Sequence, residues 1–320
     1  MIFRVEAGAY TNVSAFCVVF PCIIFFLRFF SCILYVKQKR EERQYMLIEL
    51  TYACSMGCSH CMSDCKPDGH HMTEEVLNDV FDFLKSHNIL QISNHPLSFS
   101  GGEMFEHPDI LRLLDVIEER WDKATPIIFI TNGRQLVRDK ENYKKVEQLQ
   151  KKYGKKKIMI QVTDDQRFYP DKLSEKEKYW LGKLDALIDT VPGDKYDNKK
   201  CLYPQGRALE NYSDESWNTI GPKCANSRLL PLQGVNSVTG IVAALSSAGR
   251  FCTPVIAPDG SIKLGESALC PPAATIYDTD REIIKKIKKF QCHACKIPFN
   301  RLKKMNPVAY DMLGGSWMSE

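Results

Sequence analysis

The chain has 320 residues, of which 44% are hydrophobic and 26% are charged, so it can bury the cores of one large and one small domain, which excludes a disordered tail or an extended scaffold. The net charge of +4 is mild, and no aromatic residues interleave with the lysine clusters, so we expect no nucleic-acid partner. The chain has 13 cysteines but not the composition of a disulfide scaffold, which indicates a reducing compartment.

Residues 1–45 differ in composition from the rest of the chain. The stretch from Phe16 to Tyr35 is dense in Phe, Ile, Val and Leu and is long enough to cross a bilayer. The basic residues that follow it, between Lys37 and Arg43, would keep the next domain in the cytoplasm. Two interpretations stay open: residues 13–36 tether a cytoplasmic protein to the inner face of the membrane, or the segment is a non-native extension and Met46 is the natural start.

A strand is predicted from Met46 to Thr51, and a loop with three cysteines follows it. Cys54, Cys58 and Cys61 have the spacing C-x3-C-x2-C, with a glycine between them. Cysteines this close in one loop can converge on a single metal centre without long-range folding. Three thiolates can hold three corners of a cubane cluster and leave the fourth iron open to a substrate or cofactor.

Two other interpretations of the cysteine loop stay open. Cys58 and Cys61 can form half of a zinc knuckle, because tetrahedral sulfur sites suit zinc as well as iron. Cys65 extends the run toward a ferredoxin-type pattern, in which four cysteines close the cluster and the site only carries electrons.

The segment from Leu97 to Glu103 reads as a buried strand that runs into a Gly-Gly turn. Gly101 and Gly102 let the backbone approach a ligand closely, and the Glu103 carboxylate can face a cation. Two further strands end in polar residues, and the strand ends of a parallel barrel are where its ligands bind. Four residues are therefore candidate ligand contacts, although each is equally well explained as an ordinary strand-end cap: Thr131, Asn132, Gln161 and Thr163.

Helices are predicted between these strands. The first begins at Thr73, whose hydroxyl can cap it, and the second begins near Pro108. The third runs from Gln135 to Tyr153 and ends at Gly154. The alternation of strand and helix indicates a parallel α/β sheet, and the stretch from Met46 to about Leu232 has room for roughly six such units of about 30 residues each. The barrel is expected to occupy residues 46–235.

A second cysteine set begins after residue 235. The segment from Ile256 to Leu264 has Pro-Asp-Gly between short apolar runs, which predicts a hairpin, and a basic helix is predicted from Asp280 to Phe290. Four cysteines in and after this segment can close a metal site: Cys252, Cys270, Cys292 and Cys295. Zinc and an iron–sulfur cluster both fit four cysteine ligands, so the identity of the metal stays open.

The cysteine loop and the Gly-Gly-Glu segment downstream of it resemble the two motifs of the radical S-adenosylmethionine (SAM) superfamily. The resemblance implies a partial (β/α)6 barrel, which is TIM-like, and a 4Fe-4S cluster on the three loop cysteines whose free iron chelates SAM. It also implies that His60 contacts the adenine and that Glu103 and the backbone of Gly101 and Gly102 receive the SAM amino group. Asn132 and Thr163 would then line the ribose or the substrate.

The second cysteine set resembles the C-terminal twitch domain of the same superfamily, the single-cluster relative of the SPASM domain. This resemblance implies that residues 236–320 form a small domain, made of a β-hairpin and a helix, with an auxiliary 4Fe-4S cluster. Because four cysteines would ligate that cluster fully, we expect it to relay electrons rather than to bind the substrate.

The expected activity is that of an oxidoreductase in which a flavodoxin- or ferredoxin-type donor supplies one electron and SAM is cleaved to a 5′-deoxyadenosyl radical. The expected substrate is a peptide or protein side chain, with a separate peptide-recognition protein as a further partner. Dehydrogenation of a small molecule is the alternative, and a non-catalytic iron–sulfur or zinc module is the alternative of a different class. Arg207, in a Gly-Arg segment similar to one late in the family's barrel, is a candidate for binding a carboxylate or a structural turn residue.

Overall fold

The computed structural model describes residues 46–89, 96–191, 202, 205–212, 235–247, 254–265, 268, 270–290, 300, 303–304 and 306–312. The expected membrane tether at residues 13–36 lies outside the described residues. In the parts of the chain that the structure describes, no helix has the length and apolar character needed to cross a membrane.

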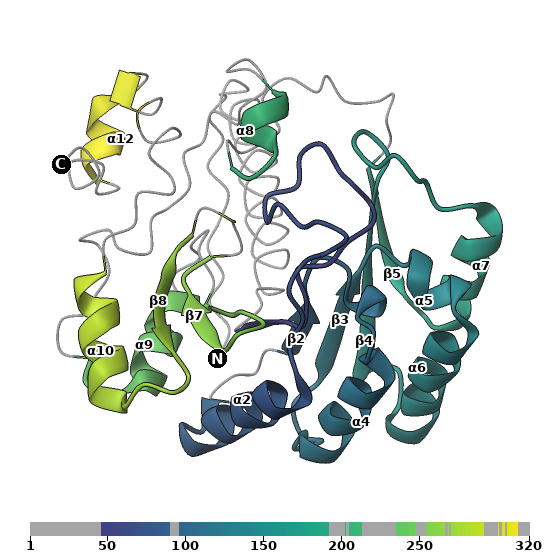
Figure 1. Cartoon of the computed structure of the whole chain (residues 1–320), viewed down its shortest axis with the longest axis horizontal. Coiled ribbons are helices and arrows are strands. Elements are labelled where there is room, and N and C mark those ends of the chain that lie inside the picture. Colours follow the sequence, from purple (N-terminus) through teal and green to yellow (C-terminus); the bar gives the residue numbers. More distant parts are fainter. Residues whose placement is uncertain are drawn as a thin grey trace, which may run out of the picture. The chain divides into compact units, whose positions relative to one another are not determined.

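Five strands form a parallel sheet in which each strand pairs with the next one along the chain (Figure 1). This winding adds every new strand on the same side, as in a partial TIM-like barrel. The predicted α/β class is therefore confirmed. The strands are β1 (Leu47–Glu49), β2 (Leu97–Ser100), β3 (Ile127–Thr131), β4 (Ile158–Asp165) and β5 (Leu187–Val191).

Helices follow the strands in sequence and pack against one another in the order α2, α4, α6, α5 and α7 (Figure 1). A consecutive parallel winding with right-handed crossovers places its helices on one face of the sheet. These helices are α2 (Glu74–Ser86), α4 (Ile110–Arg120), α5 (Arg134–Arg138), α6 (Lys140–Tyr153) and α7 (Glu175–Lys183), and a short 3-10 turn, η1 (Met104–Glu106), precedes α4.

One predicted helix start agrees with the structure, and one predicted helix does not. The Thr73 hydroxyl accepts a hydrogen bond from the Val76 amide at 3.3 Å and caps α2 as predicted. The single helix predicted from Gln135 to Tyr153 is wrong, because the chain breaks at Asp139 into α5 and α6. The Asp139 backbone is extended, and its carboxylate accepts hydrogen bonds from the first amides of α6, so it caps a new helix.

The two faces of the sheet differ in polarity, because successive side chains of a strand point to opposite sides. Apolar side chains of β1 to β4, such as Ile48, Phe99, Phe129 and Ile160, are at most 2% exposed and form one core with the helices. Many of the residues that alternate with them are polar. The inner face of the partial barrel is therefore able to hold polar groups, and its residues include Glu49, Ser98, Ser100, Gln161 and Thr163.

The C-terminal strands continue the same sheet on the other side of β1. β6 (Val255–Ile256) pairs with β1 in parallel, and β7 (Ser261–Lys263) pairs with β6 as the predicted hairpin. β8 (Pro272–Thr275) forms the edge, and α10 (Asp280–Lys289) confirms the predicted basic helix. The remaining described helices are α8 (Ala208–Asn211), α9 (Val238–Ser247) and α12 (Pro307–Met312).

The sixth parallel strand, β6, lies after residue 235, whereas all six were expected before it. About six strand–helix units were predicted before residue 235, and in the described residues five parallel strands lie there. The sixth parallel position, beside β1, is taken by β6. The division into a barrel at residues 46–235 and a second domain at residues 236–320 stays a prediction.

Candidate functional site

A cavity of about 230 Å³ lies where β1 to β4 end. Residues that follow four different strands meet there, because the carboxyl ends of parallel strands lie at the same edge of a sheet. Residues singled out in the sequence are among those that line it, including Cys54, Cys58, His60, Cys61, Gly101 and Gly102.

Backbone hydrogen bonds hold the cysteine loop at its beginning and its end. The Cys54 amide donates to the Lys66 carbonyl at 3.0 Å, and the Lys66 amide donates to the Tyr52 carbonyl at 3.2 Å. Inside the loop, the Cys61 amide donates to the Cys58 carbonyl at 3.2 Å. The loop is therefore closed on itself, and this closure directs its thiols to one pocket.

The thiols of Cys54 and Cys58 lie in an environment that favours their protonated form. Burial raises the pKa of Cys54 to about 12, and burial together with the neighbouring Cys61 raises the pKa of Cys58 to about 12. Metal binding has to displace these protons, so cluster loading should be coupled to proton release.

Cys61 is in a different environment, because two donors reach its sulfur. The Cys65 thiol donates a hydrogen bond to it, which lowers the pKa of Cys61 and raises that of Cys65. The Arg207 guanidinium also donates to this sulfur. The fourth thiol of the loop therefore lines the same pocket and contacts a predicted ligand.

The turn that carries Arg207 is pressed against the cysteine loop. The Arg207 amide donates to the Cys61 carbonyl at 3.0 Å. A Cβ atom on Gly206, which has a φ of +54°, would lie 2.2 Å from the Cys61 carbonyl oxygen, so only glycine fits there. The Gly-Arg segment therefore acts as a turn that brings the Arg207 cation to the pocket. The binding of a carboxylate by Arg207 stays a prediction.

The donor set matches an iron–sulfur cluster in kind. Thiolates are the usual ligands of such clusters, and the three predicted ones line a single cavity. In the described parts of the chain, no group of three or more His, Cys, Asp or Glu side chains is arranged to hold a single metal ion. The three thiols therefore line one cavity. The Cys61 sulfur accepts hydrogen bonds from Cys65 and Arg207.

The backbone of the Gly-Gly turn is hydrogen-bonded to the backbone just before the first cysteine of the loop. The Gly102 amide donates to the Thr51 carbonyl at 2.7 Å, and the Glu103 amide donates to the Ala53 carbonyl at 2.8 Å. A Cβ atom on Gly102 would lie 2.3 Å from the Ala53 carbonyl oxygen. In the sequence analysis, Gly102 was explained by the close approach of a ligand. In the structure, the backbone that leads into the cysteine loop also lies close to Gly102.

The Glu103 carboxylate is placed differently from the expectation. Its side chain was expected to face a cation in the pocket, but the residue is 1% exposed and both oxygens accept hydrogen bonds from the protein. Oε1 accepts from the Thr131 hydroxyl at 2.6 Å and from the Phe105 amide at 3.1 Å, and Oε2 accepts from the Asn132 amide at 2.7 Å. Glu103 therefore ties the turn after β2 to the end of β3.

His60 lines the pocket, and its ring packs at an angle of 34° against another aromatic ring. The centroids of His60 and Phe168 are 4.5 Å apart. Burial lowers the pKa of His60, and Nδ1 has no hydrogen-bond partner among the described residues. The neutral ring is thus held by Phe168 in a place where it can contact a planar ligand.

The polar ends of β3 and β4 behave in part as predicted. Thr131, Asn132 and Thr163 line the pocket, whereas Gln161 is not among the lining residues. The sequence missed Tyr169, which lines the pocket from the loop between β4 and α7. No strand or helix pattern includes Tyr169, so no sequence signal pointed to it.

The second predicted metal site lies mostly outside the described residues. Cys252, Cys292 and Cys295 are not described, and Cys270, which is described, is half-buried. Ala268 contacts the first cysteine loop, because its amide donates to the Met62 carbonyl at 3.0 Å. The auxiliary cluster therefore stays a prediction.

No family model and no curated protein matches this chain. Among solved structures it is similar to BtrN in complex with AdoMet and 2-DOIA, with a TM-score of 0.44 and 15% identity over 82% of this chain and 86% of that one. It is also similar to Streptococcus suis SuiB bound to the precursor peptide SuiA, with a TM-score of 0.38 and 14% identity over 80% of this chain and 70% of that one. These values are too low to transfer a ligand or an activity to this chain.

Proposed function

We propose that the chain is a radical SAM enzyme whose cysteine loop holds a 4Fe-4S cluster through Cys54, Cys58 and Cys61. The observation that carries the proposal is the convergence of these three thiols, the Gly-Gly turn and the ends of β3 and β4 on one cavity. Three protein ligands leave one iron of a four-iron cluster open, and the rest of the cavity offers polar and aromatic groups to a bound SAM.

Bound together, the cluster and SAM would supply one-electron cleavage of SAM to methionine and a 5′-deoxyadenosyl radical, with a flavodoxin- or ferredoxin-type protein as the electron donor. The residues of the chain position SAM and exclude water. His60 would contact the adenine, and Asn132 and Thr163 would contact the ribose or the substrate. The backbone of Gly101 and Gly102 would receive the SAM amino group.

We further propose that the reaction oxidises a peptide or protein side chain. The proposal follows from the resemblance of the second cysteine set to a twitch domain, in which Cys252, Cys270, Cys292 and Cys295 would hold an auxiliary 4Fe-4S cluster. That cluster would accept one electron from the substrate radical, so that the substrate is oxidised overall. A separate protein would help to present the peptide.

The test is anaerobic reconstitution with iron and sulfide, followed by incubation with SAM and dithionite. We expect 5′-deoxyadenosine to form with the unmodified chain and not with Cys54→Ala. The Cys292→Ala variant should retain at least part of this activity, because it affects only the auxiliary site. Iron and sulfide are counted in each protein before the incubation.

The same measurements distinguish the alternatives. Formation of 5′-deoxyadenosine by Cys54→Ala would overturn the assignment of the ligands. A cluster that forms without any cleavage of SAM would favour an electron carrier, in which Cys65 is the fourth ligand. Bound zinc without sulfide would favour a non-catalytic metal-binding module.

A further inference from the structure

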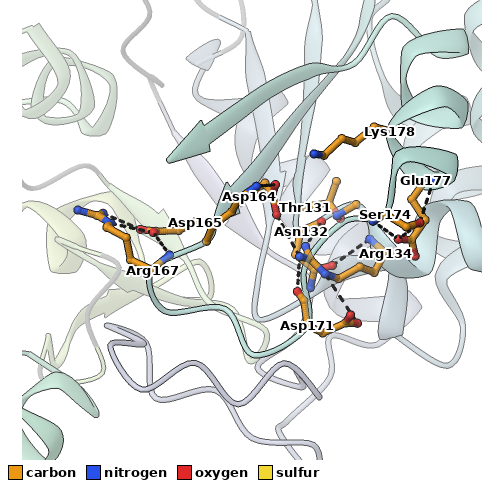
Figure 2. A network of polar contacts seen from close by, with 12 residues as sticks. Thr131, Asn132, Arg134, Asp164, Asp165, Arg167, Asp171, Ser174, Glu177 and Lys178 are labelled. Carbon is orange, nitrogen blue, oxygen red and sulfur yellow. Dashed lines mark hydrogen bonds and ion pairs between the residues drawn. The ribbon is translucent and has the colours of Figure 1, made fainter. Parts of the chain in front are cut away.

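Arg134 lies behind the wall of the pocket and is almost fully covered. It is the first residue of α5, and its side chain is 3% exposed. One terminal nitrogen donates to the Asn132 carbonyl at 2.7 Å. The other donates to Oδ1 of Asp164 at 3.1 Å and also to the Asp171 carbonyl. Figure 2 shows the Arg134 side chain between Asp164 and Asp171, with dashed lines to both sides.

The partners of Arg134 belong to three segments that each supply a residue to the pocket. Asn132 lies at the end of β3 and lines the pocket itself. Asp164, which is fully buried, follows Thr163 on β4, and Thr163 lines the pocket. The third segment is the loop of residues 166–173, which carries Tyr169. The guanidinium carbon lies 5.3 Å from the centroid of the Tyr169 ring.

The chemistry of this position requires arginine. A guanidinium has five N–H donors in a rigid plane, so it can donate in several fixed directions at once, whereas an ammonium group is a compact charge on a flexible stem. The buried Asp164 carboxylate needs a cation beside it, since an unpaired buried charge is strongly unfavourable. Lysine would keep the charge but could not hold the three segments in the same geometry.

The loop of residues 166–173 has a second, exposed attachment that provides a matched comparison. Arg138, one turn further along α5, donates to the Asp171 carboxylate at 2.7 Å and to Glu177 of α7 at 2.6 Å. Its side chain is 44% exposed. Exposed ion pairs of this kind contribute little to stability, so Arg138 should matter much less for the loop than Arg134 does.

We propose that Arg134 is a positioning residue that holds the loop of residues 166–173 against the cysteine pocket, and with it Tyr169. Through Asn132 and Tyr169 it sets the width of the cavity in which SAM binds, a consequence that rests on the proposed function. Arg134 does not line the cavity and has no part in cluster ligation. Its loss should therefore affect the loop and the binding of SAM, but not the iron content.

The test compares Arg134→Lys with Arg138→Lys, since both variants keep the charge and the trypsin site at the altered position. Limited trypsin digestion under nitrogen reports on the loop through cleavage after Arg167 and Lys172. SAM binding to the reconstituted protein is measured by equilibrium dialysis. For Arg134→Lys we expect roughly tenfold faster cleavage and a roughly tenfold higher Kd for SAM, with unchanged iron content. For Arg138→Lys both changes should stay below about threefold.

Cleavage rates and a Kd within about twofold of the unmodified protein in Arg134→Lys would overturn the proposal. A loss of iron in this variant would also overturn it, because Arg134 would then support the cluster site itself. If Arg134→Lys does not fold, Asp164→Asn keeps the size of the partner and removes its charge, and faster cleavage after Arg167 is again expected. If the unmodified protein fails to bind SAM, the proposed function fails, while the trypsin comparison still decides whether Arg134 holds the loop.

Discussion

Glu103 is a buried carboxylate, and its charge depends on the balance between the cost of burial and the hydrogen bonds that it accepts. Burial raises the pKa of Glu103 to about 7, although hydrogen bonds from Thr131, Asn132 and Phe105 act in the opposite direction. The group that joins the ends of β2 and β3 therefore changes its charge near neutral pH, whereas an exposed glutamate would be ionised throughout this range.

The folded-state pKa of Glu103 lies above the value of 4.5 for an unperturbed glutamate, so the folded protein holds this proton more tightly than the unfolded chain. The stability that results is present below pH 4.5 and is lost as the pH rises through 7. Glu103→Gln lacks this contribution. We expect the unfolding free energy of the unmodified protein, relative to Glu103→Gln, to fall by about 2 kcal/mol between pH 5 and pH 8 in urea denaturation. A difference that is constant or rises with pH would contradict this account of Glu103.

At the scale of single residues, the sequence predicted well those groups that have a fixed spacing. Cys54, Cys58, Cys61 and His60 share one short loop, so local chain geometry alone brings them to one pocket. Tyr169 and Arg134 were not predicted, because their positions depend on contacts between α5, β4 and the loop that follows it. No spacing in the sequence encodes such contacts.

The cysteine loop and the Gly-Gly turn are two elements that depend on each other through their backbones. Gly102 donates its amide to Thr51 at 2.7 Å, and no side chain fits at position 102 because the Ala53 carbonyl occupies that space. The turn after β2 therefore fixes the start of the loop that carries the cysteines. A change in one element should displace the other.

We expect Gly102→Ala to destabilise the protein by about 1–3 kcal/mol, because an added methyl group forces backbone shifts in a packed region. It should also lower the iron content after reconstitution, since the loop start is displaced. The matched control is Gly182→Ala in α7, where an added Cβ meets no atom within 4 Å and alanine favours the helix by about 0.5–1 kcal/mol. Chemical denaturation and iron counting on both variants check this, and equal effects of the two substitutions would contradict it.

The helices and strands were predicted more reliably than their ends. The 3.6-residue spacing of apolar residues and the Thr73 cap placed α2 correctly. The break at Asp139 was missed because the apolar pattern continues across it, while the carboxylate of Asp139 stabilises a new helix start. The one sequence signal for this break was Asp139 itself, because aspartate favours helix caps and is unusual in the middle of a helix.

At the scale of the whole molecule, the C-terminal hairpin is attached to the segment before the cysteine loop by partly buried polar contacts. Lys263 of β7 is 7% exposed, and its ammonium group donates to the Tyr52 hydroxyl at 3.3 Å. That hydroxyl donates to the Glu49 carboxylate at 2.8 Å. In the sequence analysis the hairpin was assigned to a second domain because of the second cysteine set. This contact was not predicted, because a side-chain contact between segments so far apart in the sequence has no local signal.

We expect Lys263→Met to lower the unfolding free energy by about 1–3 kcal/mol, because the half-buried Tyr52 and the buried Glu49 lose a cationic neighbour. The control is Lys286→Met on α10, which removes an ion pair with Asp278 from a lysine whose side chain is 49% exposed and should cost less than about 1 kcal/mol. Urea denaturation of the two variants measures both effects. A larger loss for Lys286→Met would show that the hairpin is not held through Lys263.

The proposed function requires that the loop cysteines hold a cluster with one open iron that binds SAM. Electron paramagnetic resonance of the reduced, reconstituted protein before and after addition of SAM tests it most directly. We predict that SAM changes the cluster spectrum of the unmodified protein and of Cys292→Ala, and that Cys54→Ala gives no such response. A cluster spectrum that stays the same when SAM is added in excess would contradict the account.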